Sequence, residues 1–116
     1  MSPSFDLQID AEHTKPGETV SGTVVVREGG RSRSLEVSLE FVEETDDYTE
    51  VATSISSGHL HEGKLESGMS FAFALALPPD ALPAVRSRHG QLYWRLDAKS
   101  DERGPDSHER RRIEIG

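Results

Sequence analysis

The stretch Ser34–Phe41, SLEVSLEF, has the clearest strand pattern of this chain. Apolar side chains occupy every second position, and Glu36 and Glu40 stand between them. Successive side chains of a strand point to opposite faces, so this pattern buries one face and leaves the other in water. A sheet with one wet face is typical of antiparallel architecture. The stretch therefore predicts an amphipathic strand in an antiparallel sheet.

The same two-residue period recurs on both sides of this stretch. Further strands are predicted at residues 5–9, 20–26, 48–56, 71–77, 92–99 and 109–115. Clusters of Gly, Pro, Asp and Ser lie between these segments and are typical of turns. The 48–56 segment is the most polar, which indicates an edge strand. Seven or eight short strands without a helix of three turns predict an all-β, immunoglobulin-like antiparallel sandwich, with a closed barrel as the second choice.

Three local features lead to predictions of their own. Gly22 lies inside a predicted strand, which indicates a bulge or the close approach of another backbone. Alanines at positions 72, 74 and 76 alternate with large apolar residues, so we expect another element to pack closely over that second face. The connection 80–90 is long enough for one short helical turn, which we place around Ala81 and Leu82.

Trp94 is the single tryptophan and stands at an inward position of the strand predicted at 92–99. We expect its side chain to fill the centre of the sandwich. The length of 116 residues predicts one domain over residues 1–116. A domain of this size buries roughly two-thirds of the surface that its unfolded chain exposes, which suffices for a core without disulfides or metal.

The composition excludes several classes of protein. The chain has no cysteine, which excludes a disulfide framework, a cysteine-ligated metal site and a thiol nucleophile. No apolar run approaches the roughly 18 residues of a membrane span, and the N-terminus lacks a signal-peptide pattern, so we expect a cytoplasmic protein. The net charge of −8 disfavours nucleic acid and anionic membranes as partners.

The charge is unevenly distributed along the chain. Residues 1–80 hold 5 basic and 15 acidic side chains, whereas residues 81–116 hold 8 basic and 6 acidic ones. The candidate binding residues are the arginines of this second part that we expect to be accessible: Arg86, Arg88, Arg110 and Arg112. Guanidinium groups bind carboxylate and phosphate oxygens well, so these arginines indicate a site for a phosphate or for an acidic segment of a partner protein. The alternative is an ordinary solvated surface.

Four segments, in the same order, resemble the N-terminal half of arrestin-family proteins. They are KPGETVSGTV (residues 15–24), SLEVSLEF (34–41), LESGMSFAFALALP (65–78) and GQLYWRLDAK (90–99). The resemblance covers nearly the whole chain and is nearest to the bacterial sporulation-control branch and to the retromer-subunit (Vps26-type) branch. It implies an immunoglobulin-like sandwich that acts as a scaffold for protein binding and not as a catalyst. Arrestins pair two such sandwiches, whereas this sequence accounts for one, so a second copy or a separate chain is a plausible partner.

Two clusters suggest an alternative function, an ion- or small-ligand-binding module. His59 and His61 are separated by two, so on an extended strand their rings would share a side. The acidic run 43–47 with Glu50 offers oxygen ligands for calcium between loops. Neither cluster has a third ligand at a defined spacing or a known loop pattern, so we assign no metal and no cofactor. A solvated loop and a solvated hairpin end are the simpler interpretations.

Catalytic motifs are absent from the sequence. There is no Gly-x-Ser-x-Gly turn, no phosphate loop and no dinucleotide fingerprint. A Ser/His/Asp set assembled in space and a carbohydrate site remain minor alternatives, the latter because aromatic residues make up only 6 % of the chain. We therefore expect a non-enzymatic scaffold or adaptor that binds another protein. An added strand at an exposed sheet edge is one way of binding, and self-association is another.

Overall fold

The computed structural model describes residues 2–11 and 13–116, which form nine strands and no helix. The strands are β1 (Ser4–Ile9), β2 (His13–Thr14), β3 (Thr19–Glu28), β4 (Ser34–Thr45), β5 (Thr49–Glu62), β6 (Ser70–Ala76), β7 (Val85–Ser87), β8 (Gly90–Asp101) and β9 (Ser107–Ile115). All the predicted strands are present, and two short ones, β2 and β7, are added. None of the described residues belongs to a helix that is long and apolar enough to cross a membrane.

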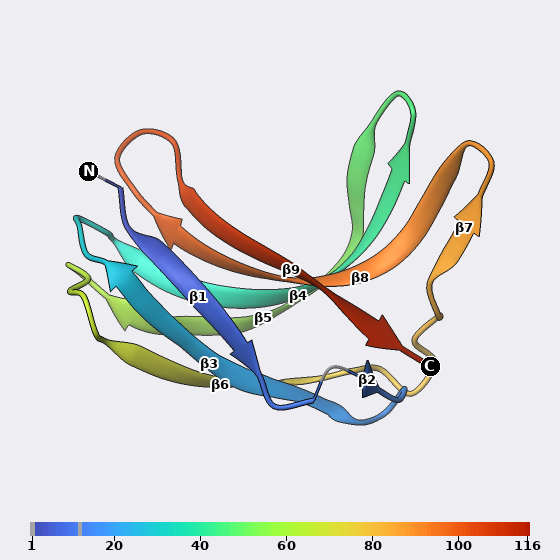
Figure 1. Cartoon of the computed structure of the whole chain (residues 1–116), viewed down its shortest axis with the longest axis horizontal. Helices are drawn as coiled ribbons and strands as arrows, with labels where there is room; N and C mark the ends of the chain where they lie inside the picture. The colour runs from blue at the N-terminus through green and yellow to red at the C-terminus, as the bar shows by residue number, and fades with distance from the viewer. Residues whose placement is uncertain (1, 12) are drawn as a thin grey trace.

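The strands form two sheets that pack face to face (Figure 1). The smaller sheet has the order β1-β3-β6, and both of its pairings are antiparallel. The larger sheet has the order β2-β9-β8-β4-β5, and β7 extends the β9 side of β8. β5 is the outermost strand of this sheet, so the predicted edge strand is confirmed. It also runs six residues further than the sequence indicated and includes His59 and His61.

The core lies between the two sheets and is built from the apolar positions of the two-residue alternation. In β4 these positions are almost fully buried, and Glu36 and Glu40 lie on the opposite face as predicted. Ile113 and Ile115 of β9 also point inward. The inner faces of both sheets contribute to one continuous apolar cluster. The all-β sandwich predicted from the alternation is therefore confirmed.

Two local predictions are wrong. The alanines at positions 72, 74 and 76 are exposed, because they lie on the outer face of the smaller sheet and no described element covers that face. The expected helical turn at Ala81 and Leu82 is absent. Residues 78–81 form a turn instead, in which the Ala81 amide donates to the Pro78 carbonyl at 3.1 Å. Residues 81–84 form no helix and lead into β7.

Gly22 lies where two strands approach each other closely. A Cβ atom at this position would come within 2.1 Å of the Gln8 carbonyl oxygen of β1 and within 3.0 Å of the Phe73 ring of β6. The close backbone approach predicted from the sequence is therefore confirmed, and it fixes the packing of β3 between its two neighbours.

Replacing Gly22 by alanine should destabilise the protein by roughly 1–3 kcal/mol, because the neighbouring backbone must move to admit the methyl group. Equilibrium denaturation in urea measures the change. A Cβ atom at Gly63 would meet no atom within 4 Å, but the φ of Gly63 is positive, so Gly63→Ala reports the cost of backbone strain alone. An unchanged denaturation midpoint for Gly22→Ala would contradict the close approach.

Trp94 occupies the core as expected, with 3 % of its surface exposed. Its ring lies 4.8 Å from the ring of Phe41, the residue opposite it on β4. Its indole Nε1 donates a hydrogen bond of 2.8 Å to the Leu82 carbonyl oxygen. Trp94 therefore also fixes the connection between β6 and β7, a role that the alternation did not predict.

Trp94→Ala should cost about 3–5 kcal/mol of unfolding free energy, because it leaves a cavity and an unpaired carbonyl oxygen. Thermal and chemical denaturation measure the loss. Trp94→Phe fills most of the cavity but cannot donate to Leu82, so it should retain more stability than the alanine variant. Equal stability of the wild type and Trp94→Ala would contradict the central placement of the ring.

Candidate protein-binding surface

The outer face of the larger sheet is polar and hollowed. The strands bow, and the β4–β5 and β7–β8 hairpins rise at one end of the sheet (Figure 1). A hollow of about 360 Å³ lies over the middle of this face. Side chains from β4, β5, β8 and β9 line it: Glu36, Ser38, Glu40, Val51, Ser54, Ser56, Arg95, Asp97, Lys99, His108 and Arg110.

Opposite charges on neighbouring strands pair across this hollow. Arg95 Nε lies 2.8 Å from Glu40 Oε1, and only 13 % of each side chain is exposed. Lys99 Nζ lies 3.3 Å from Glu36 Oε1. Each pair joins residues directly opposite each other on β8 and β4. Cross-strand charge pairs of this kind stabilise a sheet, and the part-buried pair is screened less by solvent than an exposed one.

Asp97 is the most buried charged residue of the face, with 5 % of its surface exposed. Both of its carboxylate oxygens lie 3.1 Å from His108 Nδ1, and Arg110 Nε lies 3.7 Å from Oδ1. The sequence analysis did not identify this cluster, because only the β8–β9 register brings these groups together.

The arginines predicted to bind a partner lie along one flank of the face. Arg110 and Arg112 are exposed on β9, as the alternation predicted. Arg86 lies opposite Gln91 in the β7–β8 pair, and Arg112 Nη1 donates a 2.9 Å hydrogen bond to the side-chain oxygen of Gln91. Side chains of directly paired residues share a face, so Arg86, Arg110 and Arg112 form one row along the β8 edge, which we call the arginine row.

Arg112 is held in place within the arginine row. Its guanidinium carbon lies 4.7 Å from the centre of the Tyr93 ring, in addition to its hydrogen bond to Gln91. Tyr93 and Gln91 themselves bond to the carboxylate of Glu44, at 3.2 and 2.8 Å. This chain of contacts orients the guanidinium before any ligand arrives, which reduces the entropic cost of binding.

Arg88 lies next to the Arg86 end of the arginine row. It belongs to the turn between β7 and β8 and lines a hollow of about 190 Å³ together with Arg86, Glu44 and Asp46. The four candidate arginines therefore do not converge on one point. Arg86, Arg110 and Arg112 lie along the flank of the sheet, and Arg86 shares the carboxylates at its end with Arg88.

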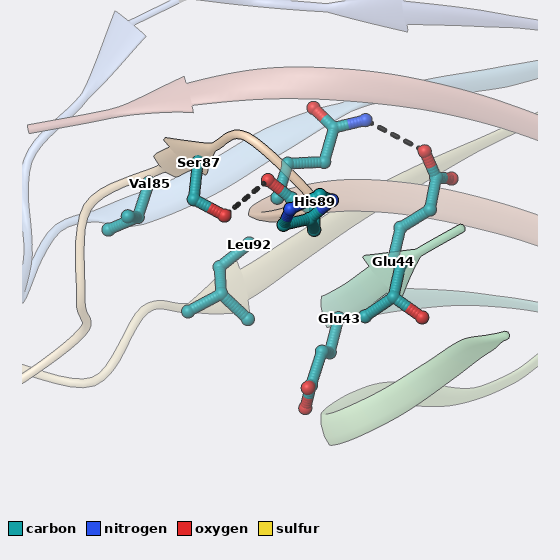
Figure 2. A pocket seen from close by; sticks show the side chains of 9 residues that line it. Glu43, Glu44, Val85, Ser87, His89 and Leu92 are labelled. Carbon is teal, nitrogen blue, oxygen red and sulfur yellow. Dashed lines mark hydrogen bonds between the residues drawn. The ribbon is translucent and has the colours of Figure 1, made fainter. Parts of the chain in front are cut away.

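A third hollow, of about 370 Å³, lies between the β4–β5 end and the β7–β8 turn (Figure 2). Val85 and Leu92 form its apolar side, and Glu43, Glu44 and His89 lie around it. Tyr48 and Val51, two of the large apolar side chains that stay exposed, lie in or beside the β4–β5 turn. The others are Val85 of β7 and Leu82 in the connection that precedes β7. Its carboxylates make this hollow a poor receptor for an anion.

The histidine pair and the acidic run, which suggested the ion-binding alternative, make other contacts in the structure. A register shift between Leu35 and Glu36 separates the environments of the two histidines. His59 Nδ1 lies 3.0 Å from Glu62 Oε1, whereas the His61 ring lies 5.2 Å from the Phe71 ring. The expectation that the rings share a side is therefore wrong. Among the described residues, no three His, Asp or Glu side chains are placed to hold a metal ion.

The acidic run 43–47 forms the end of the β4–β5 hairpin, as its turn residues predicted. Thr45 closes the turn by accepting from the amides of Asp47 and Tyr48, and Tyr48 donates its hydroxyl to Glu43 at 2.8 Å. That hydrogen bond and the nearby negative charge raise the pKa of the Tyr48 hydroxyl.

The Glu36–Lys99 pair makes stability depend on pH at both extremes. Burial opposes the charged carboxylate, but the Ser56 hydroxyl and Lys99 outweigh it and hold the pKa of Glu36 below its usual value of 4.5. The hydrogen bond to Glu36 raises the pKa of Lys99 above 10.5, against the effect of burial. Glu36 therefore contributes stability that is lost as the pH falls below about 4.5, and Lys99 contributes stability that is lost as the pH rises above about 10.5.

Glu36→Gln should flatten both limbs of the stability profile and lower the plateau between them, because the pair contributes its stability in that pH range. Urea denaturation at a series of pH values measures both slopes. Glu114→Gln, an exposed acid for which no charge partner is seen among the described contacts, is the matched control and should keep the wild-type profile. Identical acid limbs for the wild type and Glu36→Gln would contradict the pairing.

Comparisons with known proteins place the fold. No family model matches the sequence, and no curated protein matches it. The structure is similar to the crystal structure of Spo0M, a sporulation control protein from Bacillus subtilis, with a TM-score of 0.67 and 22 % sequence identity. The match covers 99 % of this chain and 49 % of Spo0M, so this chain spans about half the length of that protein. The chain therefore has the arrestin-like sandwich fold that the sequence resemblance implied. Almost the whole chain matches about one half of Spo0M.

Proposed function

We propose that this chain is a non-enzymatic, regulatory protein-binding module of the cytoplasm, folded as one arrestin-like sandwich over residues 1–116. The observation that carries the proposal is the arginine row, in which three arginines from two separate strands line one flank of a hollowed sheet face. The structural similarity to Spo0M, a sporulation control protein, supports a regulatory role.

The ligand chemistry follows from the geometry of the row. Arg110 and Arg112 are two residues apart on β9 and stand on the same face, and Arg86 continues the line along β8. An extended segment also repeats every two residues, so its carboxylate or phosphate oxygens can meet successive guanidinium groups. The positions lie on strands and not on mobile loops, which favours a defined register. The partner is therefore an extended segment of another protein that carries oxyanion groups.

A non-catalytic role agrees with the way the polar groups of this face are used. Arg95, Glu40 and Asp97 are partly or wholly buried, and each is engaged by a neighbour of opposite charge. Groups held in this way stabilise the sheet, whereas a general acid or base needs a proton that it can exchange with a substrate. The hollow therefore has a structural role, and the partner segment binds next to it, along the arginine row.

Binding of two peptides distinguishes the two sources of oxyanion. One is rich in Asp and Glu, the other carries phosphoserine at alternate positions, and both are titrated by calorimetry at low and high salt. We expect at least one to bind, and Arg110→Glu/Arg112→Glu to weaken it by at least a hundred-fold, since each of the two lost charge-assisted hydrogen bonds costs about 1.5–3 kcal/mol. Weaker binding at high salt is also expected.

Arg31→Glu/Arg103→Glu is the matched control, because it makes the same change of charge at two exposed arginines elsewhere on the chain. It should reduce binding only slightly, through the overall charge. Equal losses in the two double variants would show that net charge and not the arginine row determines binding. Failure of both peptides to bind the wild type would contradict the proposal.

A further inference from the structure

Strand β6 has one edge that no other strand uses. It pairs with β3 on one side, and within the described chain no strand pairs with its other side. The strand forms the lower left border of the molecule in Figure 1. β5 of the opposite sheet is its neighbour across the sandwich, where the His61 ring meets the Phe71 ring, but it forms no ladder with β6.

The register identifies which backbone groups point to this free edge. At the two ends of β6, the Val26 amide donates to the Met69 carbonyl at 2.8 Å and the Leu77 amide donates to the Glu18 carbonyl at 2.9 Å. Odd-numbered residues therefore direct their N–H and C=O groups toward β3, because the ladder repeats every two residues. The backbone groups of the even-numbered residues point outward: Ser70, Ala72, Ala74 and Ala76.

The other outer strands are protected against further pairing, and β6 is not. β5 is interrupted by three register shifts against β4 and carries Glu50 and Glu62. β1 carries Asp6, and β9 carries three successive arginines, residues 110–112, flanked by Glu109 and Glu114. Charges and bulges are the usual means by which sheet edges avoid unwanted pairing. The thirteen residues 67–79 contain no charge, although 29 % of the whole chain is charged.

We propose that β6 pairs with the β6 of a second copy of this chain. An antiparallel pairing with its two-fold axis at Phe73 sets Ala72 opposite Ala74 of the second copy, and Ser70 opposite Ala76. All the outward backbone groups then find partners, and the two smaller sheets become one continuous sheet. The interface uses the same patch twice, which closes the assembly at two chains.

The absence of charge favours a second copy over a foreign strand as the occupant. In the two-fold register each residue of 67–79 meets another residue of the same uncharged segment, so no like charges are opposed. A foreign segment would be selected by charges or side-chain pockets along the edge, and the residues 67–79 offer no charge for this purpose. The exposed alanines are small enough to lie opposite each other, and Pro78 ends the pairing just beyond Ala76 because it lacks an amide proton.

Light scattering after size-exclusion chromatography measures the assembly directly. The full chain should have twice the monomer mass of 12.8 kDa. Ala74→Pro removes one outward amide proton without removing a β3–β6 hydrogen bond, and it should give a monomer with the wild-type circular dichroism spectrum. Ala74→Val is the control, because it keeps the amide proton and should remain a dimer. A wild-type monomer at the highest soluble concentration would overturn the proposal.

Cysteine cross-linking tests the register and does not depend on the proline variant. The chain has no cysteine, so single substitutions give an unambiguous result. Ala72→Cys and Ala74→Cys, made in chains of different tag length, should form a mixed disulfide on mild oxidation, because paired Cα atoms about 5.5 Å apart fit a disulfide. Neither variant alone should cross-link efficiently. A dimer that gives no mixed disulfide uses another surface and would overturn the proposal, as would a foreign strand that occupies β6 in place of the second copy.

This inference is independent of the arginine row, which lies on the outer face of the other sheet. Ala74→Pro should abolish the dimer without weakening peptide binding, and Arg110→Glu/Arg112→Glu should weaken peptide binding without abolishing the dimer. The two proposals can therefore fail separately.

Discussion

Strand β8 constrains its neighbours more than any other strand described, because other strands pair with both its edges and its inner face lies in the core. β4 pairs with one edge, and β7 and β9 share the other. Its inner face places Trp94 and Leu96 in the core. Its outer face is also largely covered, so the polar residues there must find partners or incur a desolvation cost. That requirement explains the pairing of Arg95 with Glu40 and the burial of Asp97.

The functional proposal follows from this constraint. Because the carboxylates in the middle of the face are already paired with β8 and β9 side chains, the cations left accessible lie at its flank. Arg112 contacts Gln91 and Tyr93, and both of these bond to Glu44 of β4. These cross-strand contacts therefore orient Arg112 within the arginine row.

The two sheets differ in how they meet solvent. The outer face of the larger sheet carries charges on four strands, whereas the outer face of β6 carries only alanine and serine. The larger sheet suits a ligand recognised by its charge, and the edge of the smaller sheet suits a strand recognised by its backbone. The two surfaces proposed for association therefore lie on different sheets of the sandwich.

The sequence alone determined which residues form strands and which side of each strand faces the core. Alternation needs only neighbouring residues, so it predicted the core positions of β4, the burial of Trp94 and the outward position of Arg110 and Arg112. The close approach at Gly22 was likewise visible as a glycine inside a strand. These properties are local, because the hydrophobic effect buries the apolar face of a strand whichever strands become its neighbours.

Only the tertiary structure decided which strands are neighbours and in what register. The cluster of Asp97 with His108 and Arg110, and the alignment of Arg86 with Arg112, depend on pairings between segments distant in sequence. The same holds for two of the wrong expectations. Nothing in the alanines of β6 showed that they face solvent, and one register shift sent His59 and His61 to different surroundings. Sheet register is fixed by long-range packing, so the sequence pattern determined the strands and the tertiary structure determined the site.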